Sequence, residues 1–378
     1  MRALVYVGPN SAELQDRPAA RPVNRDDVVV EVVGTGVCGT DRKILLGRFP
    51  ARPGVVLGHE SAGVVRETGP QVSSVGVGDR VVVNPTLYCG WCVPCRRGAT
   101  NFCRHKAGTE VGVDRDGTYA EAVTLPERFV ERVPAGLPFR SAVLIEPLAC
   151  VLSNVKAAAV TFDDTVVVLG AGPIGMLTAL VAARQARRVT VAEPDGYRLE
   201  QAREQCAHVV DVVDVAGTDT AEAVVKAVRG ERPSVVFDTT GTGLDAALRL
   251  IDDGGRVVVM GFDDTYTVPL RPLQLTNRGI RLIGAGDYRA DIFPVAVDLA
   301  AELGGLHRPG SGALPVLERL VTHEFPLEHH AEAFAALGGL TQGDGYDGTG
   351  GPPRYEALKV VIRSHSGPVG ADGWPVGT

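Results

Sequence analysis

Four cysteines fall within fifteen residues of one another, in the pattern Cys89-x2-Cys92-x2-Cys95-x7-Cys103. This spacing lets four thiolates reach one tetrahedral ion, the geometry that Zn²⁺ adopts in structural sites. Since all four ligands would be sulfur, no position stays open for a substrate, and the ion is expected to be structural. An iron–sulfur cluster and simple buried thiols are the competing interpretations. Basic neighbours would offset the negative charge of such a centre; they are Arg96, Arg97, Arg104, His105 and Lys106.

A glycine-rich segment supplies a second kind of chemistry. Gly170-Ala171-Gly172-Pro173-Ile174-Gly175 follows an apolar run at 165–169 and precedes helical spacing at 176–187. In that context the first glycine permits a tight turn, the second lets a pyrophosphate approach the backbone, and Gly175 lets helix and strand pack closely. The alternative is a glycine-rich turn without a ligand. The segment predicts a dinucleotide site with its phosphates at the helix N-terminus.

Two residues bear on which dinucleotide binds. Glu193 ends the next predicted strand, where a carboxylate accepts hydrogen bonds from ribose hydroxyls and repels a 2′-phosphate, so NAD is favoured over NADP. Arg198, five residues further on, could instead pair with that phosphate. The choice between NAD and NADP therefore stays open.

A third set of residues combines a thiol, an imidazole and a carboxylate. Cys38 opens the run Cys38-Gly39-Thr40-Asp41, and His59 and Glu60 follow Gly58. Taken alone, Cys38 is typical of a buried thiol and His59 of a histidine in a turn.

The composition limits the partners and the cellular compartment that we expect for this protein. The chain has 378 residues, 45 acidic against 38 basic side chains, a net charge of −7 and 45% hydrophobic residues. That length suits two or three globular domains, and the acidic balance argues against nucleic acid or a membrane surface as partner. We expect no signal peptide and no spanning helix, hence a cytoplasmic protein whose cysteines are reduced.

The pattern of short apolar runs predicts two kinds of domain. Runs at 3–7, 28–33, 62–66 and 80–83, separated by Gly and Pro, indicate a partly closed, mostly antiparallel β-barrel. Later runs alternate with helical stretches and indicate a doubly wound parallel sheet, an α/β fold. These runs lie at 165–169, 188–193, 234–238, 256–260 and 280–283.

The predicted boundaries are 1–150 with the cysteine lobe at 85–106, 151–287 for the dinucleotide-binding domain, and 288–378 returning to the first domain. A last strand is expected at 356–363. A mobile loop is expected at 338–353 and a frayed tail at 365–378, because both are rich in glycine or small polar residues.

These motifs together resemble the zinc-containing alcohol dehydrogenases of the medium-chain dehydrogenase/reductase family. The resemblance rests on Gly58-His59-Glu60-x2-Gly63-x5-Gly69-x2-Val72, the cysteine lobe, Leu144-Ile145-Glu146-Pro147-Leu148 and the glycine-rich segment, in that order, and covers about residues 1–363. It implies a GroES-like, mostly β-barrel catalytic domain and a Rossmann domain. Within the family, the chain looks most like the sorbitol (polyol) and archaeal-type glucose dehydrogenase branches.

The resemblance also implies roles for individual residues. A catalytic zinc would be held by Cys38 and His59, with Glu60 and Glu146 ligating directly or through water, and Asp41 would orient His59. An open zinc position lowers the pKa of a bound hydroxyl, and Thr40 could pass its proton on. Lys43 stands where many relatives place a relay histidine, so the relay would end in solvent or at Lys43.

Other implied contacts lie later in the chain. Gly261, Phe262, Ala285 and Gly286 match segments that line the nicotinamide in polyol dehydrogenases. Asp287 and Tyr288 are candidate substrate contacts, although Asp287 stands where polyol dehydrogenases place an arginine and is equally well read as a solvated loop residue. A carboxylate there would suit an amino sugar or aminocyclitol. Cys150 and Cys206 are read as packed thiols.

The expected activity is hydride transfer between NAD(P) and a secondary alcohol or ketone of a polyol, sugar or (amino)cyclitol. The alternatives are an NADPH-dependent biosynthetic reductase of aminoglycoside-type metabolism, and a nucleotide-binding protein without turnover. Members of this family commonly pair through the edge of the second sheet, which implies a homodimer or homotetramer.

Overall fold

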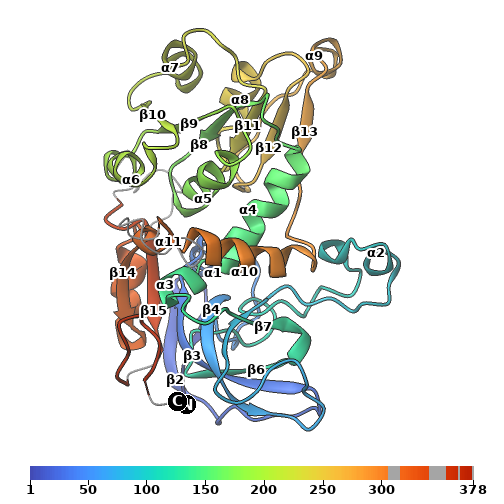
Figure 1. The fold of residues 1–378 in the computed structure, drawn as a ribbon, viewed down its shortest axis with the longest axis vertical. Coiled ribbons are helices and arrows are strands. Elements are labelled where there is room, and N and C mark those ends of the chain that lie inside the picture. Colours follow the sequence, from blue (N-terminus) through green and yellow to red (C-terminus); the bar gives the residue numbers. More distant parts are fainter. Residues whose placement is uncertain (305–315, 340–354, 365–366, 377–378) are drawn as a thin grey trace. The chain divides into compact units, whose positions relative to one another are not determined.

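The computed structural model describes residues 1–304, 316–339, 355–364 and 367–376, which divide into two compact units (Figure 1). The first unit comprises Met1–Ala149, Arg289–Gly351 and Lys359–Thr378, and the second comprises Cys150–Tyr288 and Pro352–Leu358. The chain thus returns to the first unit after Tyr288, but the short segment at 355–358 lies with the second. Most of the loop expected at 338–353 falls outside the described residues.

A seven-stranded sheet forms the first unit together with a separate hairpin of β1 and β2. Its strands are β1 (Arg2–Gly8), β2 (Ser11–Asp16), β3 (Asp27–Gly36), β4 (Glu60–Thr68), β5 (Arg80–Val83), β6 (Ala122–Pro126), β7 (Val130–Arg132), β14 (Val321–Pro326) and β15 (Lys359–Arg363). Its helices are α1 (Gly39–Leu45), α2 (Val93–Arg96), α3 (Phe139–Ala142), α10 (Ile292–Leu303), α11 (Val316–Leu320) and α12 (His330–Ala335), with short 3₁₀ turns at Thr100–Phe102, Glu127–Phe129 and Leu327–His329.

The expected partly closed barrel is confirmed. β6 pairs with β3 and β7 pairs with β5, on either side of β4, although β6 and β7 are consecutive in the chain. The chain therefore joins the two edges of the sheet around a core of buried valines, leucines and Phe129. Among the described strands of this sheet, all pairings are antiparallel except that of β14 with β15. The last strand, expected at 356–363, is β15, which pairs with β3 and begins three residues later, at Lys359.

The expectation of a frayed tail is wrong for residues 367–376. Trp374 is fully buried, and its indole N–H donates to the carbonyl of Leu137 at 2.7 Å. Asp372 forms an ion pair with Arg80 at 2.7 Å. Burial of one large aromatic side chain outweighs the local preference of a glycine-rich segment for disorder.

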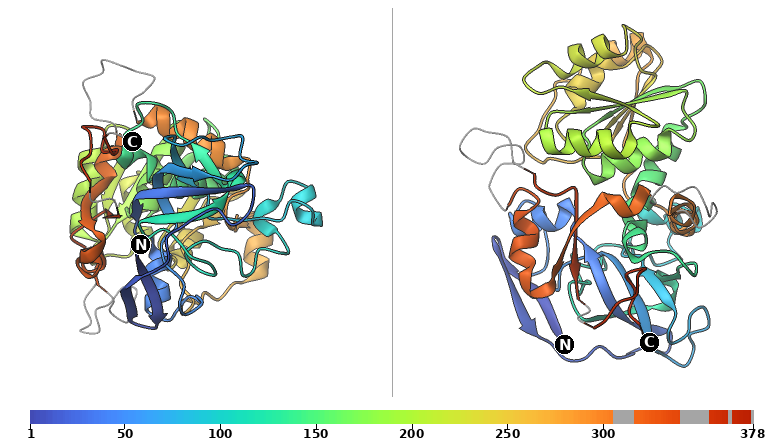
Figure 2. Two further views of the ribbon diagram at one scale, coloured as in Figure 1. Left: turned by 90° about the horizontal axis from the view of Figure 1, so that it is seen from below. Right: turned by 60° about the vertical axis from the view of Figure 1, so that its left-hand side comes forward.

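A six-stranded parallel sheet forms the second unit, with helices on both of its faces (Figure 2). The strand order is β10-β9-β8-β11-β12-β13, the order of doubly wound dinucleotide-binding folds. The strands are β8 (Thr165–Leu169), β9 (Arg188–Glu193), β10 (Asp211–Asp214), β11 (Val235–Asp238), β12 (Arg256–Val259) and β13 (Arg281–Ile283). The helices are α5 (Pro173–Ala182), α6 (Gly196–Cys206), α7 (Thr220–Ala227), α8 (Leu244–Leu250) and α9 (Pro272–Arg278), and α4 (Ile145–Ala158) leads into the sheet from the first unit.

Two details differ from the sequence-based expectation. The helix predicted at 176–187 is α5, which begins at Pro173 and ends at Ala182, and residues 183–185 form a turn after it. Strand β10 was not predicted, since its Asp-Val-Val-Asp sequence lacks a long apolar run. Among the described residues, no helix has the length and apolar character needed to cross a lipid bilayer.

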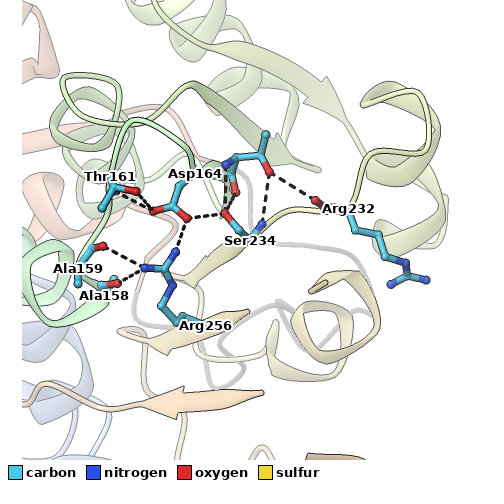
Figure 3. Close-up of polar contacts among 8 residues, drawn as sticks. Ala158, Ala159, Thr161, Asp164, Arg232, Ser234 and Arg256 are labelled. Atoms are coloured by element: carbon cyan, nitrogen blue, oxygen red, sulfur yellow. Dashed lines mark hydrogen bonds and ion pairs between the residues drawn. The ribbon is translucent and has the colours of Figure 1, made fainter. Parts of the chain in front are cut away.

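A buried polar cluster holds the amino-terminal edge of this sheet to the end of α4 (Figure 3). The guanidinium of Arg256 pairs with Asp164 and donates to the carbonyls of Ala158 and Ala159 at 2.9 and 3.0 Å. Asp164 also accepts from the Ser234 hydroxyl at 2.7 Å. Although desolvation raises the pKa of Asp164, these hydrogen bonds and the Arg256 charge lower it overall.

Replacing Arg256 by methionine is therefore expected to lower the free energy of unfolding by about 3 kcal/mol, because Asp164 would be left as a buried, unpaired charge. The pKa of Asp164 is depressed in the folded state, so its contribution is present above its unfolded value of about 3.9 and is lost as the pH falls below that value. The difference in free energy of unfolding between wild type and Arg256→Met should therefore become smaller at acidic pH.

Urea denaturation of Arg256→Met at neutral and acidic pH measures this, with Arg281→Met as the control because Arg281 is exposed on the neighbouring strand β13. Equal stability of the two variants would show that the cluster contributes nothing.

Candidate functional site

The four clustered cysteines converge in the first unit, on the segment between β5 and β6. The Sγ–Sγ distances are 3.4 Å for Cys92–Cys95, 3.9 Å for Cys92–Cys103 and 4.0 Å for Cys89–Cys95. A tetrahedral ion with bonds of about 2.3 Å to sulfur places its ligands about 3.8 Å apart, whereas a disulfide needs about 2.05 Å. All four cysteines are free thiols and their sulfurs form one group of metal-ligand geometry.

The backbone around this group favours thiolates. The amide of Cys89 donates to the sulfur of Cys103, and that of Cys92 donates to Cys89. Desolvation raises the pKa of Cys92, but hydrogen bonds from amides and neighbouring thiols lower it to about 6. Desolvation and hydrogen bonds with the thiols of Cys92, Cys103 and Cys89 raise the pKa of Cys95 to about 12, although an amide hydrogen bond from Gly90 lowers it. Four sulfurs this close cannot all be charged without a cation among them, so the residues fit a closed structural zinc.

A second group of ligand atoms comes from Cys38, His59 and Glu60, which lie within 4.8 Å of one another. Cys38 follows β3 and forms the N-cap of α1, His59 precedes β4, and Glu60 is the first residue of β4, paired with Gly36. Gly58 adopts a φ of +89°, and a Cβ there would lie 2.8 Å from the Tyr119 ring. This requirement accounts for the glycine of the Gly58-His59-Glu60 motif.

The expected partner of His59 is in place. Asp41 Oδ1 lies 3.5 Å from His59 Nδ1, longer than a normal hydrogen bond, and both atoms are buried without another partner. Asp41 Oδ2 accepts from the Tyr119 hydroxyl at 2.8 Å and from the amide of Cys38 at 2.9 Å. Asp41 thus faces Nδ1 and leaves Nε2 of His59 for a metal.

The mutual attraction of His59 and Asp41, together with their other polar neighbours, outweighs the effect of burial on the pKa of each. Desolvation lowers the pKa of His59, but the charges of Asp41 and Cys38 raise it well above its ordinary value. Burial raises the pKa of Asp41, and its interaction with His59 together with the hydrogen bonds from Cys38 and Tyr119 lowers it overall. A positive charge is therefore strongly favoured between these groups.

Sequence reasoning missed Lys359, the first residue of β15. It is 2% exposed, and its Nζ forms an ion pair with Glu60 and donates to the carbonyl of Val37 at 2.9 Å. Desolvation lowers its pKa, but the charges of Glu60 and Cys38 raise it overall. Gly36 leaves room for the pair, since a Cβ there would lie 2.8 Å from Lys359 Cε. A lysine inside the apolar run Ala-Leu-Lys-Val-Val-Ile was the available signal.

Three other residues predicted for this site, Glu146, Thr40 and Lys43, lie in the same unit but outside the three-ligand group. Glu146 is buried in the first turn of α4 and is not part of the three-ligand group, although its charge acts on Lys359. Thr40 and Lys43 lie on α1, both half-buried, and the amide of Thr40 donates to Cys38 Sγ.

The donor set fits a divalent zinc ion. Sulfur, imidazole nitrogen and carboxylate oxygen are the ligand types zinc takes, and three protein ligands leave its fourth position open. Cys38 as thiolate, Glu60 and Glu146 would place three negative charges around the single positive charge of Lys359. A bound dication would balance this excess.

Replacing Lys359 by methionine is expected to lower the free energy of unfolding by about 3–5 kcal/mol, because the buried Glu60 would lose its only cationic side-chain partner among the described residues. Thermal and urea unfolding measure the loss. Adding Glu60→Gln should recover part of it, and Lys226→Met on the exposed face of α7 should cost little. A Lys359→Met protein as stable as the wild type would contradict this interpretation.

The glycine-rich segment forms the turn from β8 into α5 in the second unit. Gly170 adopts a φ of +97°, and a Cβ at Gly175 would overlap the carbonyl of Gly170. Gly172 is the N-cap of α5, makes no side-chain cap bond, and is followed by Pro173 and Ile174 in the first turn. The amides at this helix end, beside a glycine without a side chain and the guanidinium of Arg198, form a cradle for a pyrophosphate.

Glu193 and Arg198 flank this turn. The Glu193 carboxylate accepts from the amides of Ala171 at 2.5 Å and Asp195 at 2.8 Å, and desolvation raises its pKa. Arg198 lies in the first turn of α6, with its guanidinium carbon 3.7 Å from the position of a Cβ on Gly172. Both side chains therefore adjoin the cradle.

The other predicted coenzyme and substrate residues follow β12 and β13. Gly261 lies against the backbone of residues 239–241, where a Cβ would overlap, and Phe262 is 49% exposed. Ala285, Gly286 and Asp287 form the segment after β13, and Tyr288 is buried. Because the carboxyl ends of parallel strands meet at one edge of a sheet, these residues share that edge with the glycine turn.

Comparison with known proteins finds two family domains, one after the other along the chain. Residues 24–135 match the alcohol dehydrogenase GroES-like domain, and residues 173–302 match the zinc-binding dehydrogenase domain. D-xylulose reductase A of Aspergillus oryzae is 31% identical over 345 residues, 88% of this chain and 92% of that protein.

Two solved structures are similar throughout. One is a zinc-binding dehydrogenase of Sinorhizobium meliloti bound to NADP, with 27% identity, a TM-score of 0.80, and coverage of 96% of this chain and 98% of that one. The other is the Escherichia coli alcohol dehydrogenase RspB with NADH, with 28% identity, a TM-score of 0.81, and coverage of 96% and 99%.

Proposed function

Because this chain belongs to the zinc-containing alcohol dehydrogenases of the medium-chain dehydrogenase/reductase family, we propose that it interconverts a secondary alcohol and a ketone on a polyol or sugar. The observation that carries the proposal is the convergence of Cys38, His59 and Glu60 on one position, with a dinucleotide cradle in the same chain. The similarity to a D-xylulose reductase supports a polyhydroxylated substrate.

In this proposal the first unit holds the metal and the substrate oxygen. Cys38 Sγ, His59 Nε2 and a carboxylate oxygen of Glu60 would hold zinc, Asp41 keeps the His59 ring in its orientation, and Lys359 offsets the charge of Glu60. When bound, zinc would supply Lewis-acid polarisation of the substrate oxygen, and nicotinamide would supply the hydride chemistry.

Two residues of α1 handle the proton. Thr40 stands two residues after Cys38, so its Oγ1 can relay the proton of the substrate hydroxyl: during oxidation it accepts that proton while giving up its own toward solvent, and during reduction the transfer runs in reverse. Lys43, one turn further along α1, leads the proton toward solvent. Glu146 remains a second carboxylate that can ligate directly or through water.

The second unit binds the coenzyme. Amides at the N-terminus of α5 hold the pyrophosphate beside Gly172, and Glu193 and Arg198 contact the adenosine ribose. Gly261, Phe262, Ala285 and Gly286 line the nicotinamide, and Asp287 and Tyr288 contribute to substrate choice. We infer a homodimer or homotetramer that pairs through an end strand of this sheet, β10 or β13. We also infer a cytoplasmic location, where zinc-binding thiols stay reduced.

The test is a panel of polyols, sugars, amino sugars and cyclitols, with the matching ketones, assayed by nicotinamide absorbance with NAD(H) and NADP(H). The zinc-replete protein is expected to turn over at least one polyol–ketone pair in both directions. No turnover anywhere on the panel in either direction, by protein of full zinc content, would contradict the proposal.

A further inference from the structure

Arg198 occupies a special place in the dinucleotide cradle. It lies in the first turn of α6, where its backbone amide donates to the N-cap side chain of Asp195 at 2.9 Å. Its guanidinium lies over Gly172, the N-cap of α5, with the Cζ and one terminal nitrogen 3.7 Å from the position of a Cβ on that glycine. A dinucleotide whose phosphates rest on Gly172 would therefore bring its adenosine ribose to the edge of this guanidinium.

Among the described residues, the structure records no hydrogen-bond acceptor for the Arg198 side chain. Its Nε is buried and has no hydrogen-bond partner among the described residues. Glu193 attracts it electrostatically, but both oxygens of that carboxylate already accept backbone amides, from Ala171 and Asp195. No ion pair joins Arg198 to a carboxylate in the part of the chain that the structure describes.

An aromatic contact takes the place of that ion pair. The guanidinium carbon of Arg198 lies 3.3 Å from the centre of the Tyr355 ring. Tyr355 comes from the segment before β15, and that segment lies with the second unit although the strand after it belongs to the first. Stacking on an aromatic ring fixes the plane of a guanidinium while leaving the N–H groups at its edge available.

We propose that Tyr355 is a positioning residue for the coenzyme: it holds the Arg198 guanidinium so that its N–H edge meets the adenosine ribose, as hydroxyls or as a 2′-phosphate. The proposal rests on the proposed function only in taking the ligand to be a nicotinamide dinucleotide. A ribose hydroxyl or phosphate oxygen would provide the acceptor that Arg198 lacks among the described residues. A guanidinium already held in place loses less conformational entropy when it binds.

Calorimetry with ADP-ribose and with 2′-phospho-ADP-ribose tests this without turnover. Replacing Tyr355 by alanine is expected to weaken binding of the preferred probe about five- to twentyfold, the range of a partly desolvated cation–π contact. Tyr355→Phe should stay within about twofold of the wild type, because a phenyl ring also stacks. In the assay, KM for the coenzyme should rise while kcat at saturating coenzyme stays unchanged.

A double-mutant cycle separates positioning from a general structural effect. If Tyr355 acts through Arg198, Tyr355→Ala should add no further loss of affinity in an Arg198→Ala background. Additive losses would overturn the proposal, as would wild-type affinity in Tyr355→Ala. Tighter binding by Tyr355→Ala would also overturn it, since the ring would then cover the site instead of supporting it.

The outcome is separable from that of the proposed function. A wild-type protein that binds ADP-ribose and loses this binding in Tyr355→Ala, yet oxidises no alcohol, would leave the Tyr355 inference standing and contradict the dehydrogenase activity. A wild-type protein that binds neither probe would contradict both.

Discussion

Replacing His59 by alanine is expected to lower turnover by roughly a thousandfold or more, since it removes the imidazole ligand and with it several kcal/mol of Lewis-acid stabilisation. The expected loss is in kcat. Binding of ADP-ribose should be unchanged, because the cradle at Gly172 lies in the second unit and His59 lies in the first. Steady-state kinetics and calorimetry on the same preparation measure the two effects.

Two comparison variants make the prediction specific. Asp41→Asn keeps the ligand but changes the group that faces Nδ1, so we expect a smaller loss of about 10- to 100-fold. His208→Ala, at an exposed position after α6, should leave turnover at the wild-type level. Full activity in a folded His59→Ala protein would show that the group of Cys38, His59 and Glu60 is not the catalytic centre.

Replacing Cys95 by serine is expected to lower the melting temperature by about 10 °C or more, because structural zinc binding contributes directly to folding free energy. Residues 89–106 have few regular elements of their own. Only the four-residue helix α2 and one 3₁₀ turn lie there, and the three most buried cysteines form a small core with Tyr88 and Cys89 packed against it.

Thermal unfolding, zinc content and limited proteolysis measure the consequences of Cys95→Ser. Zinc content should fall by about one ion per chain, and new cleavage should fall within residues 85–106. Cys150→Ser serves as the control, since Cys150 lies outside both groups of metal-ligand geometry and its loss should leave the zinc content unchanged. An unchanged melting temperature with all zinc retained would contradict a structural site here.

The parts of this protein that sequence alone predicted are those whose signals are local. The cysteine lobe is set by spacing within fifteen residues, and the glycine turn is set by the strand before it and the helix after it. Buried parallel strands read as short apolar runs because both of their faces are covered, so β8 and β9 were placed with their observed bounds.

The parts that escaped prediction depend on contacts between distant residues. Lys359 and Glu60 are 299 positions apart, and only the pairing of β3 with both β4 and β15 brings them together. Tyr119 reaches Asp41 across 78 positions. A buried charge in an apolar run signals that a partner exists, but the fold decides which residue that partner is.

The carboxyl-terminal region also makes tertiary contacts that its sequence did not predict. Glycine and proline in the tail are typical of disorder, yet Trp374 packs into the first unit and bonds to Leu137, 237 positions away. Tyr355 likewise stacks on the guanidinium of Arg198, 157 positions earlier in the chain and in the same unit, although β15, which follows Tyr355 by only a few residues, belongs to the other unit. Local propensity could not foresee either contact, because both depend on tertiary packing.

Counting zinc per chain in wild type and in Cys38→Ser, alongside turnover of an active polyol from the panel, tests the central claim most directly. The wild type should hold about two zinc ions per chain, one for each group of ligand geometry, and Cys38→Ser should hold about one and be inactive. A Cys38→Ser protein that keeps both ions and full turnover would contradict a catalytic zinc at Cys38, His59 and Glu60.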